Sequence, residues 1–203
     1  NDELINNIKS LFKISNSNIV RIESIGPKIS KELQTKAIQS IVLALIMILI
    51  YISFRFDMYY ALGSVAALVH DIFLIISIFS WFNWEINLSI IAAFLTILGY
   101  SLNDTIVVFD RIRENILLEK AKTFDKMINI SLNETLSRTI ITSLTTFLVI
   151  LSLYLYGGKI IKLFSLTLMI GVMIGTYSSL FIATPVMRFM ENKFNQYNEE
   201  SEI

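Results

Sequence analysis

Five long apolar runs constrain this chain of 203 residues more than any other feature of its sequence. A helix needs about 20 consecutive, mostly apolar residues to cross the hydrocarbon core of a bilayer. The runs that reach or approach this length are residues 37–54, 58–82, 86–109, 139–156 and 163–187. Pro27 and Pro185 fall outside these runs or at their edge, so we expect no helix interior to be broken. The sequence therefore predicts an all-α polytopic membrane helix bundle.

The composition supports a membrane protein and gives no sign of an enzyme. Charged residues make up 17% of the chain, below the usual quarter, and hydrophobic residues make up 54%. The net charge of zero gives no reason to expect a nucleic-acid partner. The absence of cysteine excludes disulfides and thiolate metal sites, and His70 is the only histidine. No zinc-binding helix, phosphate-binding loop or nucleophile elbow occurs, so we expect no cofactor, no metal and no catalytic site.

Residues 1–36 differ from the rest of the chain. Apolar residues at helical spacing predict a short helix over residues 2–12, and β-branched residues predict a strand over residues 19–25. We interpret this segment as the end of an extracytoplasmic α/β domain and its lead-in to the first predicted span. Because the chain begins with Asn1, we expect it to be a fragment whose upstream part could include another span.

Basic residues are divided unevenly between the two sides that the predicted spans define. Cytoplasmic loops carry an excess of Lys and Arg, and short loops report this bias best. One side carries Arg55, six basic residues between the third and fourth spans, and two in the tail. Among its short loops, the other side carries only Lys159 and Lys162. We therefore expect residues 114–137 and the C-terminus to be cytoplasmic. Residues 1–36 carry six basic residues on the opposite side, but long segments follow the rule poorly.

The segment between the third and fourth spans, residues 114–137, is too polar to cross a membrane. Its apolar residues recur at helical spacing and are Phe124, Met127, Ile128, Leu132 and Leu136. This pattern predicts a helix at about 123–137, which either lies along the cytoplasmic membrane interface or packs on the bundle ends as an ordinary surface helix. Residues 191–203 form a polar cytoplasmic tail in this interpretation.

Small residues recur every four positions in two of the predicted spans. Faces of this kind allow neighbouring helix backbones to approach closely. In the last span they are Gly171, Gly175, Ser179 and Ala183, and in the second they are Gly63 and Ala67, followed by Asp71. We expect both faces to pack against protein, where a carboxylate such as Asp71 is tolerated.

Asp104 lies inside the predicted span 86–109 and has no Lys or Arg within one helical turn. A carboxylate in hydrocarbon costs several kcal/mol, and taking up a proton relieves this cost. Arg138 opens the fourth span from the same side, and Thr142 lies one turn further in, so all three could reach similar depth. Either Arg138 is a switch that holds Asp104 ionised when it is near, or it extends to the lipid headgroups as an anchor.

His70 and Asp71 lie near the middle of the second span. They either form a proton relay or make an inert polar contact between helices. Asn103, next to Asp104, is a further polar candidate. The charged residues from Asp110 to Glu114 are expected to form a solvated network at the helix end.

The stretch from Gly99 to Asn115, GYSLNDTIVVFDRIREN, closely resembles the signature of the SecF branch of the SecD/SecF family of protein-export membrane subunits. The resemblance extends from Gly26 to about Met187. The other agreeing stretches are Gly26-Pro27, Phe54-Arg55, Ala67–Asp71 (ALVHD), Glu85-Ile86-Asn87, Arg138–Ser143 (RTIITS), Tyr156-Gly157-Gly158 and Gly171–Ser179 (GVMIGTYSS). One departure is Ser30, where the family commonly has glycine.

The resemblance implies membership of the resistance-nodulation-division superfamily and six spans, of which the first is absent from this chain. It also implies an extracytoplasmic domain between the first and second spans. Together with SecD, such a subunit is thought to use proton flow to help secreted precursor chains leave the SecYEG channel in the bacterial inner membrane. YajC and YidC are further implied partners. The residues that match the family's proton-linked aspartate, arginine and threonine are Asp104, Arg138 and Thr142.

Two other functions compete with protein export. A proton-driven exporter of small molecules or lipids from the same superfamily shares the membrane core, but drug exporters carry large periplasmic insertions and lack the long stretch around Asp104. An intramembrane hydrolase is less compatible with the sequence because the spans contain no paired catalytic residues.

Overall fold

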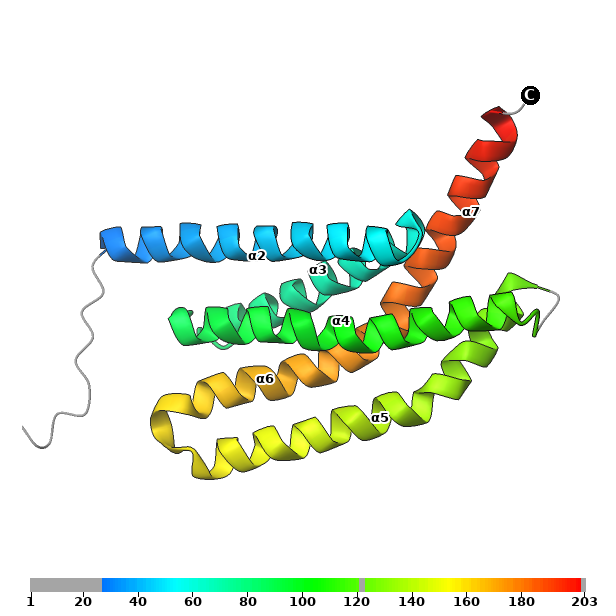
Figure 1. Ribbon diagram of the computed structural model, residues 1–203. Helices are drawn as coiled ribbons and strands as arrows, with labels where there is room; N and C mark the ends of the chain where they lie inside the picture. The colour runs from blue at the N-terminus through cyan, green and yellow to red at the C-terminus, as the bar shows by residue number, and fades with distance from the viewer. Residues whose placement is uncertain (1–26, 121–122, 202–203) are drawn as a thin grey trace, which may run out of the picture. The chain divides into compact units, whose positions relative to one another are not determined.

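The computed structural model describes residues 27–120 and 123–201 (Figure 1). The predicted helix over residues 2–12 and the predicted strand over residues 19–25 lie outside the described residues. The chain divides into two units, Asn1–Thr35 and Lys36–Ile203. In the first unit the structure describes only the opening turns of α2.

The described residues form helices and no strand. The elements are α2 (Pro27–Arg55), α3 (Met58–Trp81), α4 (Leu88–Leu117), α5 (Phe124–Tyr156), α6 (Gly158–Ser178), the π-helical turn η2 (Ser179–Ala183) and α7 (Thr184–Ser201). Five helical stretches in this part of the chain are long and apolar enough to cross a membrane, the last of them running through α6, η2 and α7. The predicted all-α polytopic membrane bundle is confirmed.

Helix α5 is continuous where the sequence analysis expected two elements, one at 123–137 and one at 139–156. No glycine or proline occurs between Phe124 and Tyr156, so nothing in the backbone chemistry interrupts the helix. Figure 1 shows that α5 changes direction along its length rather than breaking. Near this change, the Thr135 hydroxyl donates to the Ser131 carbonyl oxygen at 2.9 Å, a bond of the kind that often bends helices.

The last span contains an irregularity that the sequence analysis did not expect. Pro185 is the second residue of α7, inside a helical stretch that continues from α6 through η2. Proline has no N–H to donate to the preceding turn, and the π-helical turn η2 comes directly before it. The helical stretch continues through Pro185, so no helix interior is broken there, but its turn is irregular, and Figure 1 shows α7 leaving the direction of α6.

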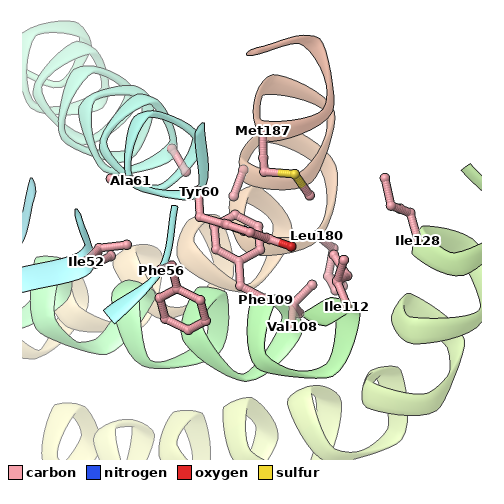
Figure 2. Close-up of a cluster of buried hydrophobic side chains, with 12 residues drawn as sticks. Ile52, Phe56, Tyr60, Ala61, Val108, Phe109, Ile112, Ile128, Leu180 and Met187 are labelled. Atoms are coloured by element: carbon pink, nitrogen blue, oxygen red, sulfur yellow. The ribbon is translucent and has the colours of Figure 1, made fainter. Parts of the chain in front are cut away.

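One hydrophobic cluster joins α3, α4 and α7 at the end of the bundle nearest η2 (Figure 2). The rings of Tyr60 and Phe109 meet edge to face with centroids 5.0 Å apart, and Met187 is fully buried beside them. A Cβ atom on Gly63 would lie 2.7 Å from the Ala183 carbonyl oxygen, so only glycine allows this approach of α3 to η2. Ala67, one turn after Gly63, is also fully buried.

A second cluster packs α3 against α4 toward the other end of these helices, where Phe79 and Phe94 meet edge to face at 5.7 Å. The outward surfaces of the bundle are apolar. Only 6% of the apolar window of α2 and 17% of that of α5 are buried within the chain. These surfaces suit contact with acyl chains or with another apolar membrane helix.

Candidate functional site

Asp104 lies on the inner face of α4 and is 3% exposed. Its Oδ2 accepts a hydrogen bond from the Ser143 hydroxyl of α5 at 3.3 Å. This distance exceeds the usual range of about 2.5–3.0 Å for a hydroxyl donor, so the bond is a weak one. Among the described residues no cation lies within ion-pair distance of Asp104, and the guanidinium of Arg138 acts on its charge only from farther away.

Ser143 connects Asp104 to a third helix. The Thr176 Oγ1 of α6 lies 2.7 Å from the Ser143 Oγ and also 2.7 Å from the carbonyl oxygen of Val172, one turn earlier in its own helix. The carboxyl group of Asp104 therefore faces a pair of hydroxyls at the junction of α4, α5 and α6. Hydroxyl groups both donate and accept hydrogen bonds, so they can solvate either protonation state of a carboxyl group.

Asp71 of α3 is more deeply buried than Asp104 and better bonded. Its side chain is 0% exposed. Its Oδ2 accepts from the Ser101 hydroxyl of α4 at 2.6 Å and from the Ser178 hydroxyl of α6 at 2.8 Å. Its Oδ1 lies 3.2 Å from Nδ1 of His70, whose side chain is 28% exposed. We call Asp71, Ser101, Asp104, Ser143, Thr176 and Ser178 together the polar centre.

Helices α4 and α6 approach each other closely at the polar centre and one turn before it in α6. A Cβ atom on Gly175 would lie 3.0 Å from Cβ of Ser101, and one on Gly171 would overlap the side chain of Ile97. Ser179, the next small residue, is fully buried and donates its hydroxyl to the Thr176 carbonyl oxygen at 3.0 Å. The small-residue face of the last span thus packs within the same chain, against α4 at Gly171 and Gly175 and against α3 at Ala183.

The structure does not bring Arg138 or Thr142 onto Asp104. Both are exposed, and the Thr142 hydroxyl lies 3.0 Å from the carbonyl oxygens of Arg138 and Thr139 in its own helix. Arg138 lines an open pocket of about 390 Å³ between α4 and α5. The other lining residues are Val107, Asp110, Arg111, Glu114, Glu134 and Thr135. Asn103 is exposed, unlike the buried groups of the polar centre.

Charged side chains line this pocket and continue past it, and we call this group the charged end. Glu134 of α5 pairs with Arg111 of α4 at 2.6 Å and with Lys120 at 2.9 Å. Fully buried Asn115 donates from Nδ2 to Ser131 Oγ and to Glu134 Oε2, both at 2.8 Å. The remaining ion pairs are Arg111–Glu114, Arg55–Asp110 at 3.1 Å, and Arg188 with Asp125 at 2.6 Å and with Glu191.

The sequence analysis missed the four hydroxyl residues of the polar centre, Ser101, Ser143, Thr176 and Ser178. Serine and threonine are common in membrane helices, and most of those described here bond to a carbonyl oxygen one turn earlier, as Ser77 and Thr96 do. The spacing of these residues in the sequence does not distinguish a hydroxyl that bonds its own helix from one that bonds a carboxyl group on another helix. Among the described residues, no three His, Cys, Asp or Glu side chains lie close enough together to hold a metal ion.

Comparison with known proteins identifies the family. The family described as "Protein export membrane protein SecD/SecF, C-terminal" matches residues 5–193. The chain belongs to the SecD/SecF family. The resemblance drawn from residues 99–115 and the shorter stretches is therefore confirmed.

Individual members of the SecD/SecF family are similar over most of this chain. A protein translocase subunit SecF of Rhodothermus marinus is 47% identical over 190 residues, covering 91% of this chain and 62% of the relative. A protein translocase subunit SecF of Helicobacter pylori is 44% identical over 200 residues, covering 98% of this chain and 62% of the relative. The chain thus spans less than two thirds of these relatives.

The fold matches a solved structure of the same family. The crystal structure of SecDF from Thermus thermophilus superposes with a TM-score of 0.83 at 38% identity, covering 95% of this chain and 27% of that one. SecDF is described there as a translocon-associated membrane protein.

Proposed function

We propose that this chain is the membrane core of an accessory subunit of the Sec protein-export machinery. With SecD it uses the proton-motive force to promote movement of precursor polypeptides through the SecYEG channel, and YajC and YidC are further partners. The names of the SecF relatives and of the SecDF structure support the export role. Membership of the SecD/SecF family favours this role over the export of small molecules or lipids.

Asp104 is the proton-carrying group in this proposal, and its environment is the observation that supports the assignment most directly. The carboxyl group is buried at a junction of three helices, faces hydroxyls, and has no cation within ion-pair distance among the described residues. A buried carboxylate in such surroundings gains from taking up a proton. Arg138, in the pocket between α4 and α5, supplies the positive charge when these helices shift, and Thr142 lies one turn further along α5.

Asp104→Asn tests the assignment because asparagine keeps the shape of the side chain but cannot ionise. The measurement is precursor translocation into inverted membrane vesicles with and without a proton gradient, using the full-length protein with its partners. We expect the variant to insert and assemble normally and to lose all gradient-dependent stimulation. Asp110→Asn is the matched control, since Asp110 is half exposed and pairs with Arg55. Full stimulation in Asp104→Asn would refute the proton-carrying role.

The proposal includes an orientation in the membrane. The excess of Lys and Arg in the short loops supports a cytoplasmic location for residues 114–137 and the C-terminus, and an extracytoplasmic one for residues 1–36. Single cysteines test this cleanly because the chain has none of its own. An impermeant thiol reagent applied to intact cells should label a cysteine at position 158 and leave one at position 125 unlabelled. The reverse pattern would overturn the orientation.

A further inference from the structure

Asp71 has no role in the proposed function, yet it is the most thoroughly bonded buried acid of the described chain. Two serine hydroxyls, from Ser101 and Ser178, both donate to its Oδ2, and these serines lie on different helices, α4 and α6. A hydroxyl has a single hydrogen, and Asp71 is the nearer acceptor for Ser178, whose Oγ also lies 3.2 Å from the Gly175 carbonyl oxygen. The carboxyl group of Asp71 thus joins α3, α4 and α6 at one point.

The bonds at Asp71 continue to Asp104 along both of these helices. In α4, Ser101 precedes Asp104 by three residues, which is one helical turn. In α6, Ser178 follows Thr176 by two residues, and Thr176 contacts Ser143, which donates to Asp104. The polar centre is therefore a closed ring, in which hydrogen bonds alternate with short stretches of helix.

A closed ring couples its two carboxyl groups mechanically. If α4 moves along α6, either the bonds at Asp71 or the contacts from Asp104 through Ser143 to Thr176 must lengthen. A Cβ atom on Gly175 would lie only 3.0 Å from the Ser101 Cβ, so this close approach leaves little space for the helices to yield in another direction. The bonds at Asp71 are short and the bond at Asp104 is long, so Asp71 sets the position and Asp104 follows it.

We propose that Asp71 is a positioning residue, which accepts hydrogen bonds from Ser101 and Ser178 and thereby sets the distance between Asp104 and the Ser143–Thr176 hydroxyl pair. This proposal rests on the proposed function of Asp104. Asp71 does not itself carry the proton. Asp71 acts through carboxyl oxygens that accept hydrogen bonds in a fixed position, and this role requires no change of its charge.

The positioning role predicts different outcomes for two substitutions that keep nearly the same side-chain shape. In Asp71→Asn the amide oxygen can accept from both serines, while the amide nitrogen can donate to Nδ1 of His70 in the tautomer with its proton on Nε2. In Asp71→Leu the branched shape remains but every acceptor is lost. A positioning residue tolerates the first change and not the second, whereas a proton carrier tolerates neither.

The experiment compares Asp71→Asn, Asp71→Leu and the double variant Ser101→Ala/Ser178→Ala in the full-length protein with its partners. Gradient-dependent translocation into inverted vesicles should stay within two-fold of wild type in Asp71→Asn and fall at least ten-fold in Asp71→Leu. The double variant should fall three- to ten-fold. It keeps the test valid if Asp71→Leu fails to assemble, because it removes the same bonds from the other side.

A second readout does not depend on export. The infrared carboxyl band of Asp104 is the one that disappears in Asp104→Asn, whatever that variant does to translocation. It should be unchanged in Asp71→Asn and shifted in Asp71→Leu and in the double serine variant. Loss of all stimulation in Asp71→Asn, or an unshifted Asp104 band in the double variant, would overturn the positioning role. Full stimulation in Asp104→Asn would instead overturn the proposed function, and the band comparison would still decide the position of Asp104.

Discussion

The polar centre and the charged end both contain acidic side chains, but these have opposite kinds of partner in the two regions. At the charged end Glu134 pairs with Arg111 and Lys120, and its carboxylate is balanced by guanidinium and ammonium groups. At the polar centre Asp104 has a hydroxyl as its hydrogen-bond partner. A cation fixes the charge of the acid beside it, whereas a hydroxyl is compatible with either protonation state. This difference supports the proposal that Asp104 changes charge, while the ion pairs of the charged end hold the helices together.

The two regions also differ in solvation. Arg55 and Asp110 at the charged end are each close to half exposed, while Asp71 and Asp104 are almost fully buried. Exposed ion pairs contribute little to stability because water solvates both partners well. Buried carboxyl groups depend entirely on the protein groups around them, so small changes in packing at the polar centre should have large consequences.

The largest expected effect comes from filling the contact between α4 and α6. In Gly175→Leu the new side chain meets Ser101, whose Cβ is already 3.0 Å from a Cβ at position 175, so the helices must separate. We expect more than a ten-fold loss of gradient-dependent translocation together with poorer assembly. Gly99→Leu is the matched control, because a Cβ at position 99 meets nothing within 4 Å. Equal effects of the two variants would show that the close approach is unimportant.

A smaller effect, confined to stability, is expected from Asn115→Ala at the charged end. Asn115 is fully buried and bonds Ser131 and Glu134, so its loss should cost about 2 kcal/mol of unfolding free energy. Thermal unfolding of the purified complex measures this cost. The control is Asn133→Ala, since Asn133 is exposed and bonds only within its own helix. Gradient dependence should survive in both, and its loss in Asn115→Ala would remove the distinction between the two regions.

Ser143→Ala should act on function at little cost to stability. It removes the hydroxyl that donates to Asp104, a bond worth about 1 kcal/mol, which corresponds to roughly a five-fold loss of gradient-dependent translocation. Ser152→Ala is the control on the same helix, because the Ser152 hydroxyl bonds the Val149 carbonyl oxygen and is exposed. An unchanged rate in Ser143→Ala would mean that Asp104 does not depend on this partner.

The smallest effect is expected from the ion pair between Arg55 and Asp110. Arg55→Ala should lower the unfolding free energy by no more than about 0.5 kcal/mol, and less at high salt, because both side chains are well solvated. The charge-swapped double variant Arg55→Asp/Asp110→Arg should recover any loss. A strong effect of Arg55→Ala on gradient-dependent translocation would extend the functional region into the charged end.

The fold class, the family and the acids that lie within the membrane-spanning helices could all be predicted from the amino-acid sequence. Apolar runs of about 20 residues leave a chain little alternative to membrane helices, because unpaired backbone groups are too costly in hydrocarbon. A carboxylate is also costly in hydrocarbon, and this cost indicated Asp71 and Asp104 as candidate functional residues. The stretch from Gly99 to Asn115 was long enough to indicate the family that the comparison with residues 5–193 establishes.

The groups that these acids contact could not be predicted, because they come from helices that are distant in the sequence. Ser143 and Thr176 lie 39 and 72 residues after Asp104 in the sequence, and no local spacing relates them. The sequence also could not place the π-helical turn beside Pro185 or join the two predicted elements of α5, because helix ends and irregularities depend on packing against neighbours. A hydroxyl in a helix bonds its own backbone by default, and only the approach of another helix redirects it to a carboxyl group.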